Sequence, residues 1–280
     1  MYNKMKRYAT HGNDADFGRF DGCLRSDFMR AAGRVVNETI FTLNPSLTEE
    51  ERRMYKVVWE EIVTTLQISR NEISITTHGN PSGNPMTTVV NCIVNLMYHW
   101  YAFRRITGMK SLASFQQNVF FTCFGDDVLF VTNHVKNGYS FAKVAKIMEE
   151  LGQEYTTASK DAASSGAEKP IEELQFLQRM FVPQSNSFVF APLRRESIEQ
   201  QFNWTMMSPR EFEAINAQIQ EASIEAAAHG AGYYNSFRAA IRDEIDNKDL
   251  RRYLNPPVSY NDAHLSLLHR LDGTIVNPRR

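Results

Sequence analysis

Cysteine, charge imbalance and long apolar runs are all scarce in this chain of 280 residues. The three cysteines, Cys23, Cys92 and Cys123, are far apart in the sequence and show no Cys/His spacing typical of zinc sites, so we expect buried thiols in a reducing compartment. The longest apolar stretch, residues 89–103, is shorter than the roughly 20 residues that span a bilayer, so no transmembrane segment is expected. A net charge of −1 does not by itself indicate a nucleic-acid partner.

The composition is that of a globular protein, with 42% hydrophobic and 22% charged residues. Its patterns predict a mixed α+β part followed, from residue 192, by an all-helical part. In the first part we expect helices at 22–43, from 48 onward, at 86–105 and at 138–151, strands at 73–77, 118–124 and 128–132, a loop over 156–170 and a second hairpin at 173–181 and 187–190. In the second part we expect helices from 208 to about 230, at 232–247 and at 261–271.

The helix that starts at Thr48 has the sequence signature of a capping box, because Glu51 lies three residues further on. Its spacing predicts a buried stripe, which would include Met54, Val58, Ile62 and Leu66.

The most specific feature is the segment Phe124-Gly125-Asp126-Asp127, between two apolar strands. A tight Gly/Asp turn between such strands predicts a β-hairpin. Asp126 and Asp127 would project two carboxylates into one place, which suits hard cations such as Mg²⁺. An ordinary solvent-exposed turn is the alternative, but the apolar flanks indicate a hairpin buried on both faces, where unpaired carboxylates would be costly.

Two further segments carry polar side chains at suggestive spacings. Asp16 and Asp21 flank a short stretch between a predicted strand and helix, although Asp21 alone could be a helix cap. The turn-rich loop around Ser82 and Gly83 leads into a helix on which four polar residues recur every fourth position: Thr87, Asn91, Asn95 and His99. Such a stripe is either a buried hydrogen-bonded seam or the lining of a site, and the glycines and prolines before it favour a site.

Taken in order, Asp-x4-Asp, Ser-Gly-x3-Thr-x3-Asn and Gly-Asp-Asp resemble motifs A, B and C of picornavirus-like RNA-dependent RNA polymerases. Thr157-Ala-Ser-Lys160-Asp161 resembles motif D, and Phe176-Leu-Gln-Arg179 resembles motif E, with Gln178 departing from the usual lysine. The resemblance covers residues 14–205. It implies an α+β fold, with a palm of antiparallel sheet backed by helices (RRM-like, with a small fingers-type element) over 1–191 and an all-α thumb over 192–280.

The resemblance also implies roles for individual residues. Asp16, Asp126 and Asp127 would ligate two Mg²⁺ ions, with Mn²⁺ as a substitute, and Lys160 would be a general acid for pyrophosphate. The RNA template and primer and the nucleoside triphosphates would be the partners, in a viral replication complex in the host cytoplasm. The expected substrate-binding residues are Asp21, Ser82, Gly83, Thr87, Asn91 and Arg179.

Three alternatives remain. A reverse transcriptase shares the palm but carries a bulky residue where Asp21 lies. A non-catalytic RNA-binding module would not need three converging carboxylates. The third is a catalytically incomplete fragment, since only fifteen residues precede Asp16, whereas the family has extensive fingers before motif A. We therefore expect this chain alone to extend primers poorly or not at all, until a fingers-containing segment or chain is added.

Overall fold

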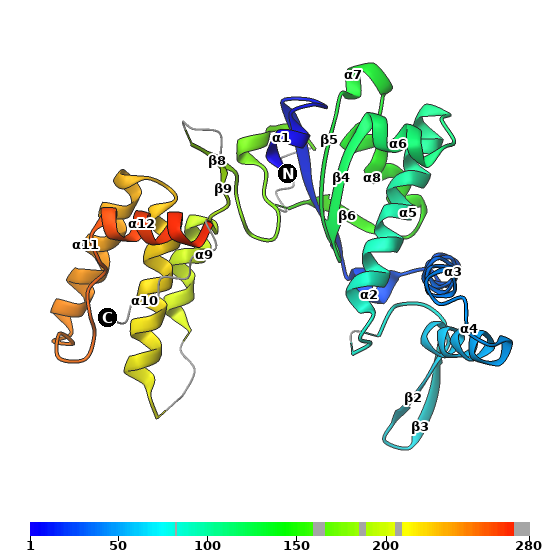
Figure 1. The fold of residues 1–280 in the computed structure, drawn as a ribbon, viewed down its shortest axis with the longest axis horizontal. Helices are drawn as coiled ribbons and strands as arrows, with labels where there is room; N and C mark the ends of the chain where they lie inside the picture. The colour runs from blue at the N-terminus through cyan, green and yellow to red at the C-terminus, as the bar shows by residue number, and fades with distance from the viewer. Residues whose placement is uncertain (82, 159–165, 185–188, 205–208, 272–280) are drawn as a thin grey trace. The chain divides into compact units, whose positions relative to one another are not determined.

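The computed structural model describes residues 1–81, 83–158, 166–184, 189–204 and 209–271. The chain forms two compact units, Met1–Leu177 and Gln178–Arg280 (Figure 1). The division falls before residue 192, the position expected from composition, because Arg179 forms an isolated β-bridge with Leu193 and thereby joins residues 178–193 to the second unit. No described helix combines the length and the apolar character needed to cross a bilayer.

The first unit is a mixed sheet-and-helix layer structure. Its elements are α1 (Tyr2–Met5), β1 (His11–Gly18), α2 (Phe20–Cys23), α3 (Ser26–Leu43), α4 (Glu49–Val63), β2 (Thr65–Ser69), β3 (Glu72–Thr76), α5 (Thr87–Thr107), α6 (Leu112–Asn118), β4 (Val119–Phe124), β5 (Asp127–Thr132), α7 (His134–Asn137), α8 (Phe141–Glu150), β6 (Glu154–Thr157), β7 (Lys169–Pro170) and the 3₁₀ turn η1 (Ile171–Glu173).

The main sheet is antiparallel and has the order β4-β5-β1-β6, with β7 also paired to β1. The β4–β5 hairpin confirms the strands predicted around Gly125. Strand β6 and the short β7 were not predicted, since residues 156–170 were expected to be a loop. All residues of β5 after Asp127 are buried, so this strand is covered on both faces, whereas β4 is the half-buried edge.

Helices α5 and α8 cover one face of this sheet (Figure 1). Ala15 and Phe17 of β1 and Val128 and Phe130 of β5 point into the resulting core, where they meet apolar side chains of α5 and α8. Because side chains alternate along a strand, the residues that alternate with these core residues, including Asp14, Asp16 and Asp127, face the opposite side of the sheet. The sequence pattern of these strands therefore separates a structural face from a polar one.

The helices α3 and α4 differ from the predicted ones in part. The helix expected at 22–43 is divided into α2 and α3, because Leu24 and Arg25 adopt extended backbone, and Leu24 is fully buried there. The capping box of α4 is confirmed, with both Thr48 and Glu51 making their reciprocal hydrogen bonds.

Of the stripe predicted for α4, only Ile62 packs against the core, because the helix packs on α3 mainly through another face. Trp59 and Val63 are buried, and Trp59 Nε1 donates to the carbonyl of Met29 at 3.0 Å. Met54 and Val58 are 61% and 58% exposed.

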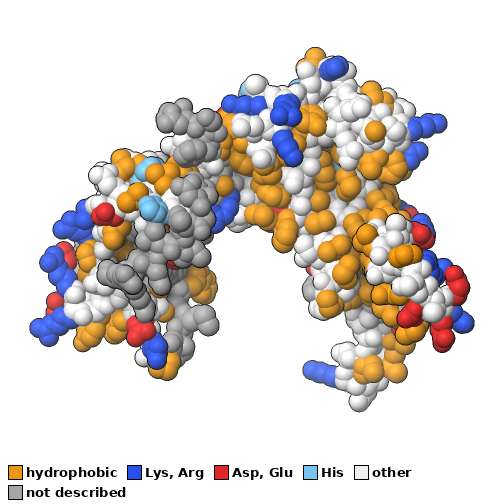
Figure 2. All heavy atoms as spheres, viewed as in Figure 1, with side chains coloured by type: hydrophobic (Ala, Val, Ile, Leu, Met, Phe, Trp, Pro, Cys, Tyr) orange, Lys and Arg blue, Asp and Glu red, His pale blue; other side chains and the backbone are white. Residues whose placement is uncertain are grey.

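After α4 the chain forms a separate two-stranded hairpin, β2–β3, that extends away from the sheet (Figure 1). Strand β3 was predicted, but β2 was assigned to the preceding helix. Leu66 pairs with Ile75 and Ile68 with Ile73, yet all four side chains are 61–79% exposed. Figure 2 shows hydrophobic side chains open to solvent over α4 and this hairpin.

The second unit is mainly helical, with its core between α10, α11 and α12. Helix α10, which was expected from residue 208, begins at Glu211, and Ser208 lies outside the described residues. The predicted second hairpin is present as a shorter antiparallel pair. The elements are β8 (Val182–Pro183), β9 (Val189–Phe190), α9 (Arg195–Gln200), the 3₁₀ turn η2 (Gln201–Asn203), α10 (Glu211–Ala227), α11 (Ala231–Asn247) and α12 (Tyr260–Leu271).

Candidate active site

The centre of the candidate site is the turn between β4 and β5. Phe124 pairs with Asp127, which leaves Gly125 and Asp126 as a two-residue turn. Gly125 has a φ of +66°, whereas an added Cβ would meet no atom within 4 Å. Glycine is therefore needed here for its backbone conformation and not for lack of space. The turn leaves Asp126 exposed and Asp127 half-buried at the end of the sheet.

The register of the sheet places Asp16 next to this turn. Ala15 pairs with Val128, so Asp16 and Asp127 are the next residues along two antiparallel neighbours and share the polar face. Burial raises the pKa of the Asp127 carboxyl, and the negative charges of Asp126 and Asp16 raise it further. A backbone hydrogen bond from Leu177 opposes this rise. The three carboxylates thus lie close enough to repel one another.

Asp14 lies on the same face of β1 but is used differently. Its side chain is 1% exposed, and it forms an ion pair with Lys169 at 3.1 Å. The backbone N–H of Gln175 also donates to Asp14, at 2.9 Å. A buried, compensated carboxylate of this kind anchors the β7 segment to the sheet. Asp14 therefore has a structural role and is not one of the candidate metal ligands.

No three acidic, histidine or cysteine side chains among the described residues are grouped closely enough to hold a metal ion as they stand. The candidate carboxylates share one face and the end of one sheet, but cation binding would require them to turn toward a common point. Their chemistry fits that task, because all of them offer hard oxygen donors and carry mutually repelling charge.

A second polar cluster joins α2, the loop before α5, and α5 itself. The side-chain amide of Asn91 donates to the carboxylate of Asp21, and its oxygen accepts from Asn80 Nδ2 at 2.9 Å. Asn80 is itself held by the chain, because its backbone N–H donates to Asp21 O at 2.7 Å. The structure therefore brings together Asp21 and Asn91, which are separated by 70 positions in the sequence.

Thr87 holds the loop that precedes α5. Its hydroxyl lies 3.0 Å from the carbonyl oxygen of Pro81 and 2.6 Å from that of Asn84, and its own carbonyl accepts from Asn80. Gly83 is exposed in this loop, and an added Cβ there would meet nothing within 4 Å. Ser82 lies outside the described residues.

The sequence did not single out the contacts that α5 makes with the turn itself. Asn95 is fully buried, and its Nδ2 donates to the Gly125 carbonyl at 2.9 Å. Cys92 Sγ accepts the Gly125 N–H at 3.3 Å. One helix thus holds both polar groups of the glycine that precedes Asp126. In the sequence, only the four-residue spacing between Asn91 and Asn95 indicated that Asn95 faces the same side of α5 as the candidate site.

His99 continues the same stripe but belongs to the core. It is buried between two tyrosines, with Nδ1 2.8 Å from Tyr139 Oη and Nε2 3.2 Å from Tyr155 Oη. Burial lowers the pKa of His99 to about 3, so the ring is neutral at physiological pH. The polar stripe of α5 therefore contacts the candidate site through Asn91 and Asn95, and it forms a buried hydrogen-bonded seam at His99.

One predicted site residue lies elsewhere. Arg179 belongs to the second unit, where its guanidinium forms a bidentate pair with Glu225 at 3.0 and 3.2 Å. This pair connects the β-bridge segment to α10. Lys160 lies outside the described residues.

With this geometry in place, comparisons with known proteins are informative. Residues 1–245 match the family model for viral RNA-dependent RNA polymerase. The chain is 32% identical over 241 residues to the replication polyprotein of Nora virus, covering 84% of this chain and 11% of the polyprotein. It is 29% identical over 252 residues to the replicase polyprotein of Cricket paralysis virus, covering 85% of this chain and 14% of that protein.

A solved structure agrees with the fold. The Sicinivirus 3Dpol RNA-dependent RNA polymerase superposes with a TM-score of 0.73 at 20% identity, covering 98% of this chain and 53% of the solved one. The chain thus spans about half the length of that polymerase and a small fraction of the polyproteins. The predicted fold, an antiparallel palm sheet backed by helices and followed by a helical part, is confirmed. The chain belongs to the viral RNA-dependent RNA polymerase family.

Proposed function

We propose that this chain carries the nucleotidyl-transfer site of an RNA-directed RNA polymerase that copies viral RNA. The observation that supports it most is the adjacency of Asp16 and Asp127 on one face of the sheet, with Asp126 on the adjoining turn. Mutual repulsion among these carboxylates favours a site that takes up cations. In this proposal residues 1–191 act as the palm and residues 192–280 as the thumb.

Polymerases of this family use divalent cations, and we assign two Mg²⁺ ions, replaceable by Mn²⁺, to Asp16, Asp126 and Asp127. When bound, the cations would offset phosphate charge and make the primer 3′-hydroxyl more acidic. The chain itself would supply the fixed positions of the three carboxylates, which the sheet register and the turn determine. Positioning of this kind accounts for much of the rate of phosphoryl transfer.

The Asp21–Asn91 pair is assigned to the ribose 2′-hydroxyl of the incoming nucleotide. Both groups already hydrogen-bond to each other, and Asn80 holds Asn91 from the other side. Thr87 orients the loop of Ser82 and Gly83 beside the nascent base pair. Lys160 remains the proposed general acid, and the segment Phe176–Arg179 the proposed support for the primer end.

The partners follow from this chemistry: an RNA template and primer, nucleoside triphosphates, and a fingers-containing segment or chain that adds cationic groups for the triphosphate. We place the working enzyme in a viral replication complex in the host cytoplasm.

Metal binding tests this proposal without requiring synthesis. Mn²⁺ affinity of the 280-residue chain, measured by electron paramagnetic resonance, should fall at least about tenfold in Asp126→Asn, because one of the few oxygen charges is removed. Asp27→Asn is the matched control, since Asp27 pairs with Arg25 at the start of α3 and away from the turn. In a polymerase that contains this chain, Asp126→Ala should lower primer extension about a thousandfold. Equal Mn²⁺ affinity of the wild type and Asp126→Asn would overturn the metal assignment.

A further inference from the structure

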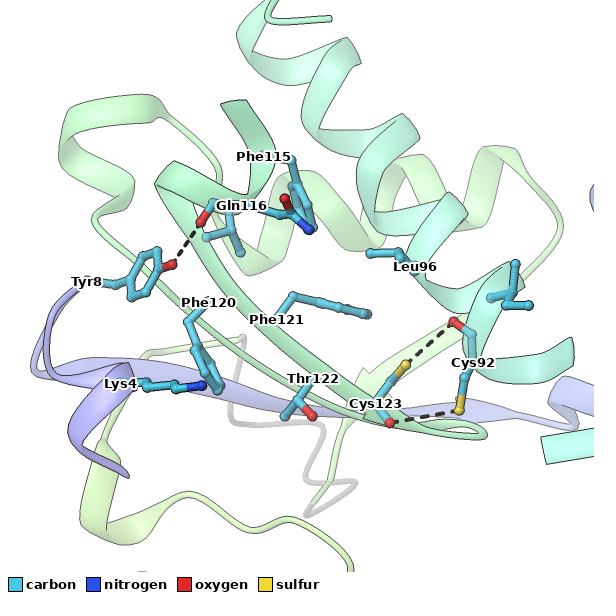
Figure 3. A pocket seen from close by; sticks show the side chains of 12 residues that line it. Lys4, Tyr8, Cys92, Leu96, Phe115, Gln116, Phe120, Phe121, Thr122 and Cys123 are labelled. Atoms are coloured by element: carbon cyan, nitrogen blue, oxygen red, sulfur yellow. Dashed lines mark hydrogen bonds between the residues drawn. The ribbon is translucent and has the colours of Figure 1, made fainter. Parts of the chain in front are cut away.

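A cavity of about 560 Å³ lies along the edge strand β4, between this strand, α5, α6 and the N-terminal segment. Its size is within the usual range for small-molecule sites. The lining is mostly aromatic and aliphatic, and it includes Leu96, Phe115 and Phe121. Figure 3 shows Lys4 and Tyr8 at one end of the cavity and two cysteines at the other.

The two cysteines are in direct mutual contact, although 31 positions separate them in the sequence. Cys123 Sγ is 3.6 Å from the carbonyl oxygen of Cys92, and Cys92 Sγ is 3.8 Å from that of Cys123 (Figure 3). Both side chains line the cavity and are half-buried, whereas the sequence predicted buried thiols. Neither is in a disulfide.

This thiol pair is also connected to the catalytic turn. Cys92 Sγ accepts the backbone N–H of Gly125 at 3.3 Å, and Gly125 directly precedes Asp126. A reagent that draws on the lone pairs of Cys92 or rotates its sulfur would leave this N–H without its partner. A buried donor left in this way favours a different turn conformation.

We propose that Cys92 and Cys123 form a dithiol modification site at the end of this cavity, which takes a small aromatic ligand that bridges two thiols, of the trivalent arylarsenical class. In the reaction, two S–As bonds form, the As–oxygen bond breaks, and the two thiol hydrogens leave with the oxygen as one water. The oxidation state of arsenic does not change. The aryl group occupies the apolar part of the cavity.

The raised pKa of Cys123 suits a bridging ligand better than a simple alkylating agent. Burial raises the pKa of the Cys123 thiol, and its neighbour Cys92 adds to this effect. Alkylation requires a thiolate and is slowed by a raised pKa. A bridging ligand gains two bonds from groups that are already adjacent, so little conformational entropy is lost.

Phenylarsine oxide is the probe for the site itself, which does not depend on the proposed polymerase function. After removal of free reagent, native mass spectrometry should find one arsenical per wild-type chain. Cys92→Ser and Cys123→Ser should each retain at least tenfold less, because one S–As bond cannot form, while circular dichroism confirms that they fold. Cys23→Ser is the matched control, since Cys23 is also half-buried but does not line the cavity.

Retention by Cys92→Ser equal to the wild type, or loss of retention in Cys23→Ser, would overturn the site. A methyl arsenical should be retained less well than the phenyl compound. Equal retention would show that the cavity does not bind the aryl group.

Coupling to the turn is measured by amide hydrogen exchange of Gly125, which should accelerate at least tenfold in the adduct. Unchanged exchange would overturn the coupling. A rise in exchange without any change in Mn²⁺ affinity would instead count against the proposed metal site, which the dithiol does not require.

Discussion

Helix α5 and the segment formed by α4 and the β2–β3 hairpin depart from the usual distribution of side chains in opposite directions. Helix α5 buries three polar residues, Asn91, Asn95 and His99. The α4–hairpin segment exposes large apolar ones, among them Ile68 at 79% and Ile73 at 71%. Buried polar groups and exposed apolar patches are the informative exceptions in a folded protein, so both regions indicate function.

The two exceptions differ in what they contribute to the fold. Each buried polar residue of α5 contacts a different element: Asn91 donates to Asp21 of α2, Asn95 donates to the β4–β5 turn, and His99 contacts two tyrosines. These hydrogen bonds offset the cost of burial and align the proposed site. In the described part of the chain, Thr65 hydrogen-bonds to the end of α4, but the apolar side chains of the hairpin are exposed on both of its faces. Its apolar side chains therefore add little to the stability of the described fold and are open to solvent.

Of the substitutions that compare α5 with the hairpin, Asn91→Ala should have the largest effect, measured in a polymerase that contains this chain. A site that hydrogen-bonds a hydroxyl rejects substrates lacking it, because its polar groups would remain unpaired. Removing Asn91 also removes the hydrogen bond that it donates to Asp21, so the preference for ribo- over deoxyribonucleotides should fall about tenfold or more. Single-nucleotide incorporation kinetics measure this preference. Thr88→Ala, on an exposed position of the same helix, is the control, and unchanged discrimination by Asn91→Ala would refute the ribose assignment.

The buried His99 of α5 should make the stability of the first unit depend on pH. Its pKa of about 3 in the folded protein lies below the usual value near 6.5, so the unfolded chain takes up the proton first. The contribution of neutral His99 to stability is thus fully present above about pH 6.5 and is lost as the pH falls toward 3. Between pH 7.5 and 5.5 the contribution of His99 should fall by about 1.4 kcal/mol.

Urea unfolding, followed by tryptophan fluorescence in a Trp204→Phe background, reports on the first unit, because Trp59 and Trp100 remain there. His99→Phe should show a smaller loss of stability between these two pH values. His78→Gln, at an exposed position, should behave as the parent. The same pH dependence in His99→Phe as in the parent would mean that His99 is not the group responsible.

Local patterns in the sequence predicted the β4–β5 hairpin, the capping box of α4 and the length of α5, because turn chemistry and periodicity determine them. Other features depend on tertiary packing. Helix α4 carries apolar residues on more than one face, and only its contact with α3 decides that Trp59 is buried rather than Val58. Similarly, contacts with Lys169 and with the backbone N–H of Gln175, both far along the chain, hold the buried Asp14, and no local pattern reports them.

The proximity of Cys92 and Cys123 has the same origin. It follows from the packing of β4 against α5, which no spacing in the sequence reports.

The smallest effect on stability should come from the exposed side of the comparison. Ile68 and Ile73 form a cross-strand pair with both side chains open to solvent. The double substitution Ile68→Thr/Ile73→Thr keeps β-branched residues in the strands, so the free energy of unfolding should change by less than about 0.5 kcal/mol. Sedimentation velocity should show weaker self-association, because apolar surface is removed. Val94→Thr is the contrasting control: it places a hydroxyl at a fully buried position of α5 and should cost about 1–3 kcal/mol. A cost of that size for the hairpin substitutions would show that the hairpin is packed in solution, and the contrast with α5 would no longer hold.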